Sequence, residues 1–377
     1  MEAGLPETPI LGLSLGLFAI LVLVLVLPFI SKKVEENLEP FFLLMGLLGV
    51  ALNYYYQTLN HEGLIELGKK ALTTPVMISG VPIGITQVVL IFGLIFYYFH
   101  PQIYGGLSSI LKRTGFIAFT FIFITILGLI SSLISVIVTA VILSEIAAAI
   151  KMERSKRIEF VVLASFAVGL GAALTPVGEP LSTIAISKLQ ESFDYLLNLL
   201  GAYIIPGVIF IAGYTAWRMK RSGVDPREVE ATYTESFSRI IERTIRVYVF
   251  IAALELLGHS FTPLVYWYFS KLEAWQLFWL NTISAVVDNA TLTAAEISPV
   301  LTAEQIRSAL LALLISGGML IPGNIPNIVA AGRLKITSRE WARVGVPFGL
   351  ALLFVYFVIV EVLGVHVSLY DLVGLLK

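Results

Sequence analysis

The sequence predicts an all-α polytopic membrane protein of about 8–10 spans, built from two inverted-topology repeats. Each repeat is expected to hold a re-entrant helical hairpin and a broken helix. Three observations lead to this prediction: apolar runs recur along the whole chain, two segments share an unusual Pro-x-x-x-Pro pattern, and basic residues gather in a few short clusters.

The composition is that of a membrane protein. Of the 377 residues, 57% are hydrophobic and 14% are charged, and the mean hydropathy is +0.89. Soluble domains carry about 25% charged residues. The absence of cysteine excludes disulfides, thiol catalysis and Cys-ligated metals. A net charge of −1 argues against a nucleic-acid partner. No Walker-type loop and no hydrolase motif occurs, so we expect no nucleotide, no cofactor and no enzymatic activity.

Apolar runs of about 20 residues predict the order of the spans. The first run lacks a basic leader, so we interpret it as a permanent helix rather than a signal peptide. Spans are predicted at about 10–30, 41–59, 76–99, 159–190, 195–217, 244–261, 306–332 and 344–365, with longer hairpin-like stretches at about 116–150 and 275–300. The predicted units are peripheral or scaffold helices at 1–75, a first repeat at 76–217, a cytoplasmic linker at 218–243 and a second repeat at 244–377.

Clusters of Lys and Arg predict the orientation in a cell membrane. Lys112 and Arg113 precede the stretch at 116–150, and a cluster from Lys151 to Arg157 follows it. Both ends of that stretch should therefore face the cytoplasm, as the ends of a re-entrant hairpin do. Counting spans in both directions then places the N-terminus outside and makes the second stretch open to the outside.

Two segments interrupt long apolar runs in the same way. The first reads Gly171-Ala-Ala-Leu-Thr-Pro-Val-Gly-Glu-Pro180, and the second reads Gly317-Gly-Met-Leu-Ile-Pro-Gly-Asn-Ile-Pro326. Two prolines at this spacing remove amide donors and clash with the preceding turn, so the helix must break. A broken helix within a membrane is tolerated where it is buried in protein or lines a site. Such a pair in two inverted halves marks the binding site of a transporter.

The polar residues near these breaks and hairpins form the candidate site. An ionisable side chain within a membrane is a functional candidate by default. The predicted cation- and proton-binding residues are Asp288, Asn289, Glu179, Thr175, Ser182, Thr291, Asn324, Asn327 and Ser135, with Asp288 and Glu179 as the carboxylates that bind the metal ion. Oxygen ligands without Lys or Arg suit a hard cation such as Na⁺.

Structural roles remain open for several of these carboxylates. Asp288 could instead cap a helix N-terminus, and Glu179 could do so before Pro180. Glu145 and Glu296 occupy similar places after the two hairpin tips, where helix-end or interface roles compete with a secondary role in proton transfer.

Two segments resemble a known family. Val287-Asp-Asn-Ala-Thr-Leu-Thr-Ala294 resembles the Asp-Asn-x-x-Leu-Thr-Ala segment of NhaD-type sodium/proton antiporters, and Gly171 to Pro180 resembles their Gly-x-x-x-Thr-Pro-Ile-Gly-Asp segment. The wider resemblance is to the ion-transporter superfamily of arsenite carriers, dicarboxylate carriers and antiporters, including an archaeal cation-transporter family of unknown function. It implies a hairpin and a broken helix in each half, a homodimer, and an ion held between hairpin tips and breaks. The chain departs from the family at Ser135-Val136, where an Asn-containing motif is usual.

The predicted function is secondary active transport in the lipid bilayer, most simply exchange of Na⁺ or Li⁺ for protons. Burial favours the protonated form of a carboxylate, so a proton and a metal ion would compete for Asp288. The transported ion is then the only bound group expected. One alternative is a sodium- or proton-coupled carrier of a small anion, such as a dicarboxylate or an oxyanion, on the same fold. A second alternative is a gated channel.

Overall fold

The computed structural model is helical throughout the part of the chain that it describes, which confirms the all-α prediction there. It describes residues 5–35, 37–77, 86–87, 90–91, 94–95, 97–99, 101–102, 109, 113–134, 136–189, 191–220, 236–269, 272–286, 289–297 and 301–371. The predicted span at 76–99 lies largely outside these residues.

Five helices among the described residues are long and apolar enough to cross a membrane. They lie at Leu11–Pro28, Leu38–Tyr55, Phe116–Leu133, Tyr195–Met219 and Ser338–Val362. Each holds at least 18 residues, close to the length that a bilayer requires. The chain therefore has the helices of a membrane protein. The described residues contain fewer full-length candidates than the about 8–10 spans predicted, because the runs at 159–190 and 306–332 are divided by breaks and most of 76–99 lies outside the described residues.

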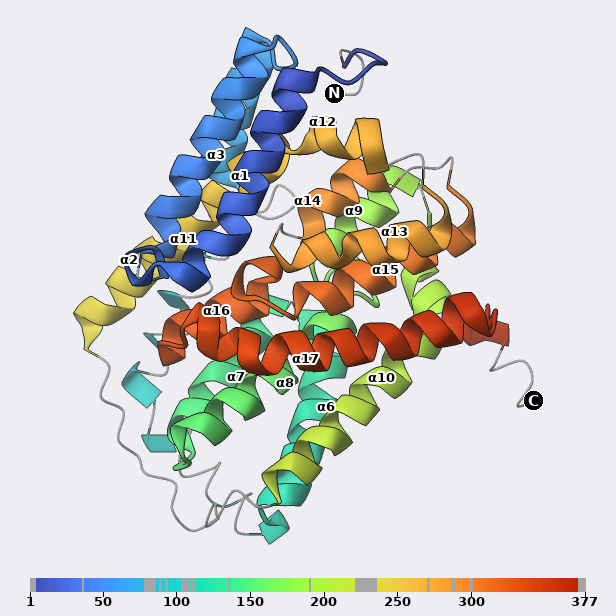
Figure 1. Cartoon of the computed structure of the whole chain (residues 1–377). Coiled ribbons are helices and arrows are strands. Elements are labelled where there is room, and N and C mark those ends of the chain that lie inside the picture. Colours follow the sequence, from blue (N-terminus) through green and yellow to red (C-terminus); the bar gives the residue numbers. More distant parts are fainter. Residues whose placement is uncertain are drawn as a thin grey trace.

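Four helices form a separate bundle. They are α1 (Leu11–Ile30), α3 (Leu38–Tyr55), α4 (His61–Thr73) and α11 (Phe237–Ser260). Helix α3 packs along α11 and also contacts α1, and Figure 1 shows α1 and α3 side by side. A Cβ on Gly49 would lie 2.4 Å from Oγ of Ser260, so this glycine allows the two helices to approach closely. The amide of Asn53 then donates to the Ser260 carbonyl at 2.9 Å. Small residues at such an interface are typical of helix pairs in membranes.

The remaining helices form a second body around α8 and α15. Its first part comprises α6 (Phe116–Ile134), α7 (Val136–Ala149), α8 (Arg154–Ala172), α9 (Pro180–Leu189) and α10 (Tyr195–Met219). Its second part comprises α13 (Ala274–Leu280), the 3₁₀ turn η2 (Asn281–Ala285), α14 (Asn289–Glu296), α15 (Ala303–Gly317), the 3₁₀ turn η3 (Ile321–Gly323), α16 (Ile325–Leu334) and α17 (Ser338–Phe357). Short segments join α11 to α13, namely α12 (Thr262–Leu264) and the π-helical η1 (Val265–Phe269), and a π-helical η4 (Val358–Val362) follows α17.

Helices α8 and α15 form the centre of this second body. Every residue of α8 from Ile158 to Ala172 is buried, and so is every residue of α15 from Ile306 to Gly317. A helix that is apolar on all faces is stable only when protein or lipid surrounds it completely. Here neighbouring helices cover both, and both end at the segments that contain the paired prolines.

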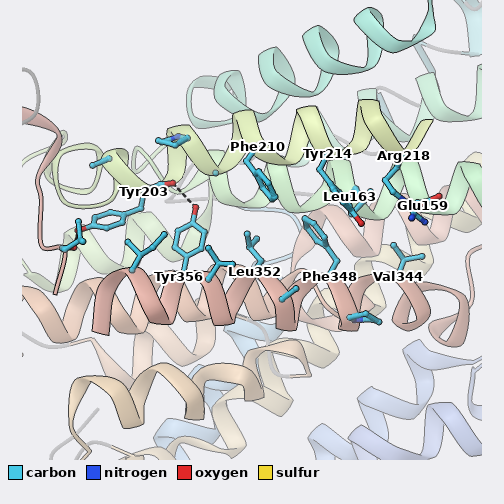
Figure 2. A pocket seen from close by; sticks show the side chains of 18 of the residues that line it. Glu159, Leu163, Tyr203, Phe210, Tyr214, Arg218, Val344, Phe348, Leu352 and Tyr356 are labelled. Atoms are coloured by element: carbon cyan, nitrogen blue, oxygen red, sulfur yellow. Dashed lines mark hydrogen bonds and ion pairs between the residues drawn. The ribbon is translucent and has the colours of Figure 1, made fainter. Parts of the chain in front are cut away.

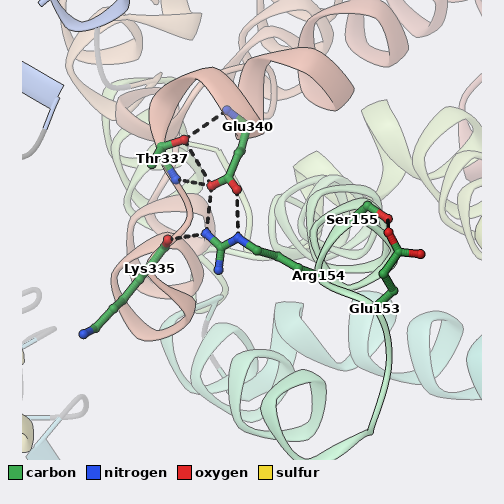
Figure 3. A network of polar contacts seen from close by, with 6 residues as sticks. All are labelled: Glu153, Arg154, Ser155, Lys335, Thr337 and Glu340. Atoms are coloured by element: carbon green, nitrogen blue, oxygen red, sulfur yellow. Dashed lines mark hydrogen bonds and ion pairs between the residues drawn. The ribbon is translucent and has the colours of Figure 1, made fainter. Parts of the chain in front are cut away.

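Ion pairs join the basic segments of the two parts at one end of the molecule. Arg154, the first residue of α8, donates from Nε to Oε1 of Glu340 at 2.8 Å and from a terminal nitrogen to Oε2 at 2.9 Å (Figure 3). The same guanidinium donates to the carbonyl of Lys335, and Thr337 and Glu340 form a capping box at the start of α17. At the same end of α8, Arg218 from the end of α10 donates to Glu159. The basic cluster at 151–157 therefore lies beside Arg218 at the end of α10 and beside the segment that leads into α17.

Candidate functional site

The first helix break follows Ala172 and is closely tied to the end of α6. Gly178 has no room for a side chain, because a Cβ there would lie 1.9 Å from the Ala172 carbonyl oxygen and 2.9 Å from Cα of Ser132. The hydroxyl of Thr175 donates to the Ser132 carbonyl at 2.5 Å. The amide of Val136, the first residue of α7, donates to the Gly178 carbonyl at 2.7 Å. The break thus lies directly against the junction of α6 and α7.

The second break follows Gly317 and is built in the same manner. A Cβ on Gly323 would lie 2.5 Å from the Ser284 carbonyl oxygen and 2.6 Å from the Gly317 carbonyl oxygen. Ser284 belongs to η2, at the centre of the second predicted hairpin. Each break therefore contains one glycine that touches the last turn of the helix before it and the predicted hairpin of its own half.

The helices that follow the two breaks begin at equivalent positions. Helix α9 begins directly after Gly178-Glu179, and α16 begins directly after Gly323-Asn324; each has 10 residues. Glu179 and Asn324 therefore correspond as the residues that precede the helices. Alignment of the prolines would instead pair Asn324 with Gly178. The structural alignment therefore differs by one residue from the alignment of the prolines, because Gly178 and Gly323 make equivalent contacts and the prolines do not lie in equivalent places.

The helices after the breaks contact the opposite half of the body. Helix α9 packs against α14, and α16 packs against α7. Helix α16 also contacts α8. The side-chain Nδ2 of Asn324, the residue that caps α16, would lie 2.7 Å from a Cβ placed on Gly169 of α8. Each half thus supplies a helix that packs against the second helix of the other half's predicted hairpin.

Asn327 at the second break presents an amide oxygen with no hydrogen-bond donor. Its Nδ2 donates to the carbonyls of Gly317 and Leu320, both at 2.8 Å. Those two acceptors fix the orientation of the amide group, because only the nitrogen can donate. The side chain is fully buried, and its Oδ1 has no partner among the described residues. A buried acceptor without a partner costs about 1–3 kcal/mol, so this oxygen is available to a ligand.

The structure places the other predicted residues as follows. Asp288 and Ser135 lie outside the described residues, and Thr291 lies on the first turn of α14. Ser182 is buried, and its hydroxyl donates to the Ala173 carbonyl at 3.1 Å. Asn324 caps α16, because its side-chain oxygen accepts from the Ile325 amide at 2.8 Å. Glu179 is buried beside the first break. Asn289 is buried at the start of α14, and its Nδ2 has no acceptor among the described residues. The described members thus belong to the two breaks and to the start of α14.

Glu145 has a defined interface role. Its carboxylate is completely buried on α7 and accepts two hydrogen bonds from Arg333 of α16, at 2.6 and 2.9 Å. Glu296 of α14 instead accepts from the amide of Asn281 at 3.3 Å. The sequence alone singled out Glu145 without its partner, because no local spacing links residues so far apart in the chain.

The close approaches at the breaks could not be read from the sequence. A Cβ on Gly171 would lie 1.8 Å from the Gly128 carbonyl oxygen, and the hydroxyl of Ser131 donates to the Val168 carbonyl at 3.0 Å. Many glycines and serines occur in apolar runs of this chain, and nothing in the local pattern separates these from the rest.

The donor set consists mainly of neutral oxygens. Among the described residues no group of three or more His, Asp or Glu side chains could hold a metal ion. The breaks offer hydroxyl, amide and unwound-backbone oxygens, with Glu179 as the carboxylate at the first break. Such a set suits a hard monovalent cation that must also leave, rather than a tightly held structural metal.

A family model described as "Protein of unknown function (DUF1646)" matches residues 14–363. The chain belongs to this family. The match extends from the first turn of α1 through η4, so both breaks lie within the unit that the family model describes. A comparison with curated proteins finds no match.

Proposed function

We propose that the protein is a secondary active transporter that exchanges a cation, Na⁺ or Li⁺, for protons. The observation that carries the proposal is the pair of equivalent helix breaks at Gly178 and Gly323, each followed by a helix that packs on the other half. Paired interrupted helices in corresponding places are the construction that transporters use for a central site. The two halves are proposed as inverted repeats with re-entrant hairpins at α6–α7 and α13–α14.

The chemistry of the breaks supports a cation as the transported species. The oxygen of Asn327 is buried and has no donor within the part of the chain that the structure describes, and a cation would satisfy it. Glu179 and Asp288 are proposed as the carboxylates that take either the ion or a proton. Since one site cannot hold both, each crossing carries one or the other, and that competition couples the two fluxes without nucleotide.

The joined basic segments support a single cytoplasmic side for that end of the body. Arg154, Glu340 and Lys335 are in direct contact, and Arg218 meets Glu159 nearby. With the positive-inside rule, this end faces the cytoplasm, and the N-terminus is proposed to lie outside. The proposed setting is a cell membrane, with the protein as a homodimer.

The test is ion-driven proton movement in proteoliposomes loaded with a pH-sensitive dye. A pulse of external Na⁺ or Li⁺ should alkalinise the lumen, because each cation that enters is exchanged for protons that leave. Asp288→Asn and Glu179→Gln should each remove this response. Glu7→Gln is the matched control, because Glu7 is exposed and distant in sequence from both breaks. Wild-type exchange in the Asp288→Asn variant would contradict the assignment.

A second candidate, cation-coupled uptake of a small anion, is favoured by one observation. The amide nitrogen of Asn289 is a buried donor without an acceptor among the described residues, and a carboxylate or oxyanion would supply one. Dicarboxylate-dependent Na⁺ uptake, with no Na⁺/H⁺ exchange in its absence, would favour this candidate over the antiporter.

A further inference from the structure

A large groove lies between α10 and α17, and no residue of the two breaks lines it. It encloses about 850 Å³ and is lined mainly by apolar side chains, including Phe210, Phe348 and Leu352 (Figure 2). Both helices are candidate membrane spans, so the groove follows the hydrocarbon region of the bilayer. Each helix contributes a proline to the lining, Pro206 and Pro347.

The charged lining residues of the groove gather at one end. Figure 2 shows Arg218 and Glu159 there, beside Val344, and Arg343 also lines the groove. Arg218 and Lys156 both pair with the Glu159 carboxylate, the latter at 2.9 Å. Arg343 is exposed and has no ion-pair partner among the described residues. Two cations therefore share the Glu159 carboxylate, and Arg343 adds a third positive charge, which leaves these four side chains with a net positive charge.

At the opposite end, none of the described residues that line the groove is charged, although Arg307 lies behind the lining with its guanidinium 5.7 Å from the centroid of the Tyr203 ring. The polar groups at this end already bind one another. The hydroxyl of Tyr356 donates to the Tyr203 carbonyl at 2.7 Å, and the hydroxyl of Tyr203 donates to the Val365 carbonyl at 2.5 Å. The amide of Val367 in turn donates to the Tyr203 hydroxyl at 3.0 Å. A ligand that fits the whole groove thus needs an anionic head at one end and a long apolar tail along the rest.

We propose that this groove binds one anionic phospholipid, with its phosphate at Arg343 and Arg218 and its acyl chains along α10 and α17. Arginine binds phosphate oxygens through paired N–H donors. Basic pockets between membrane helices on the cytoplasmic side select anionic headgroups, and this end carries the basic segments that predict that side. Burial of each methylene in an apolar groove adds to the affinity.

The experiment measures lipid binding to the purified full chain by native mass spectrometry. Phosphatidylglycerol and phosphatidylcholine with identical acyl chains are titrated separately, so that only the headgroup differs. Phosphatidylglycerol should bind more tightly to the wild type. Arg343→Gln should weaken the binding of phosphatidylglycerol about five-fold, which is the effect of one basic residue near an anionic headgroup. The same variant should leave the binding of phosphatidylcholine unchanged. Arg113→Gln, which removes an exposed arginine outside the groove, should change neither.

A second pair of variants tests the apolar part of the groove. Ala351 is exposed and lines the groove, whereas the adjacent Leu350 is exposed and does not line it. Ala351→Trp should fill the space and displace the lipid, while Leu350→Trp should bind it as the wild type does. Should Ala351→Trp fail to fold, the headgroup comparison with Arg343→Gln still decides the question.

Three outcomes would overturn the proposal. One is the loss of headgroup selectivity, seen either as equal binding of the two lipids by the wild type or as equal effects of Arg343→Gln and Arg113→Gln on phosphatidylglycerol binding. Another is that glycerol phosphate, which lacks acyl chains, competes as well as the intact lipid, which would show an anion site only. The third is that Ala351→Trp dissociates a dimer while lipid binding persists, which would make the groove an interface between two copies of the chain.

Discussion

The ion pair between Glu145 and Arg333 gives the sharpest stability prediction. It joins α7 of the first half to α16 of the second through two hydrogen bonds of 2.6 and 2.9 Å. The exposed fractions of the two side chains are 0% for Glu145 and 14% for Arg333, so solvent screens the pair little. Removal of one partner takes the opposing charge and two hydrogen bonds away from a buried pair, a change that costs about 3–5 kcal/mol. We therefore expect Glu145→Gln and Arg333→Gln each to lower the free energy of unfolding by about that amount.

The double variant distinguishes a true pair from two separate defects. The two side chains interact directly, and each single variant already removes that interaction, so Glu145→Gln/Arg333→Gln should cost less than the sum of the two single variants. The assay is chemical or thermal unfolding of the purified chain in detergent, followed by intrinsic tryptophan fluorescence. Glu242→Gln is the matched control: Glu242 pairs with Arg246 on the surface, where both side chains are more than half exposed, and its loss should cost at most about 0.5 kcal/mol.

Strict additivity of the single variants would refute the coupling between the two halves. Costs indistinguishable from that of Glu242→Gln would refute the larger claim that this contact holds α16 against α7. Either result would also weaken the argument that the helix after each break is anchored on the opposite half.

Two further predictions concern the first break. Gly178→Ala should destabilise the chain by about 1–3 kcal/mol, because its Cβ would lie 1.9 Å from a backbone oxygen. Gly332→Ala in α16 is the control, since a Cβ there meets open space, and it should be neutral or slightly stabilising. Equal unfolding midpoints for the two variants would contradict this. Thr175→Val should cost about 1–3 kcal/mol by leaving the Ser132 carbonyl without its donor, while Thr175→Ser should retain most of the stability; an equal loss in both variants would assign the effect to packing instead.

Local chemistry allowed several features to be predicted from the sequence. Prolines such as Pro180 and Pro326 cannot continue a helix that precedes them, and in the structure α8 and α15 both end before these residues. The apolar runs likewise predicted α1, α3 and α10 to within about four residues. Helix α17 differs more, since it begins at Ser338 rather than at about 344. Helix α11 differs, since it begins at Phe237 rather than at about 244. Its first turns are polar enough to have been interpreted as linker.

The partners of these helices could not be predicted in the same way. Helix α11 falls within the predicted second repeat, and its packing along α3 of the N-terminal bundle is a contact that the sequence did not indicate. Its apolar face would fit several neighbours equally well, and the choice depends on the small residues Gly46 and Gly49, which allow the close approach. The register of the two breaks is a similar case, because prolines and glycines suggest alignments that differ by one residue.

The sequence by itself determined that the chain is helical, membrane-embedded and interrupted at two matching places, since composition and proline stereochemistry act within a single segment. Only the tertiary structure decided which groups are satisfied and which are not. It pairs Glu145 with Arg333 and ties Thr175 to the end of α6, and none of the described residues donates to the oxygen of Asn327. These outcomes depend on contacts between distant segments, and a hydrogen bond is made or left unmade only when packing brings the second partner within reach.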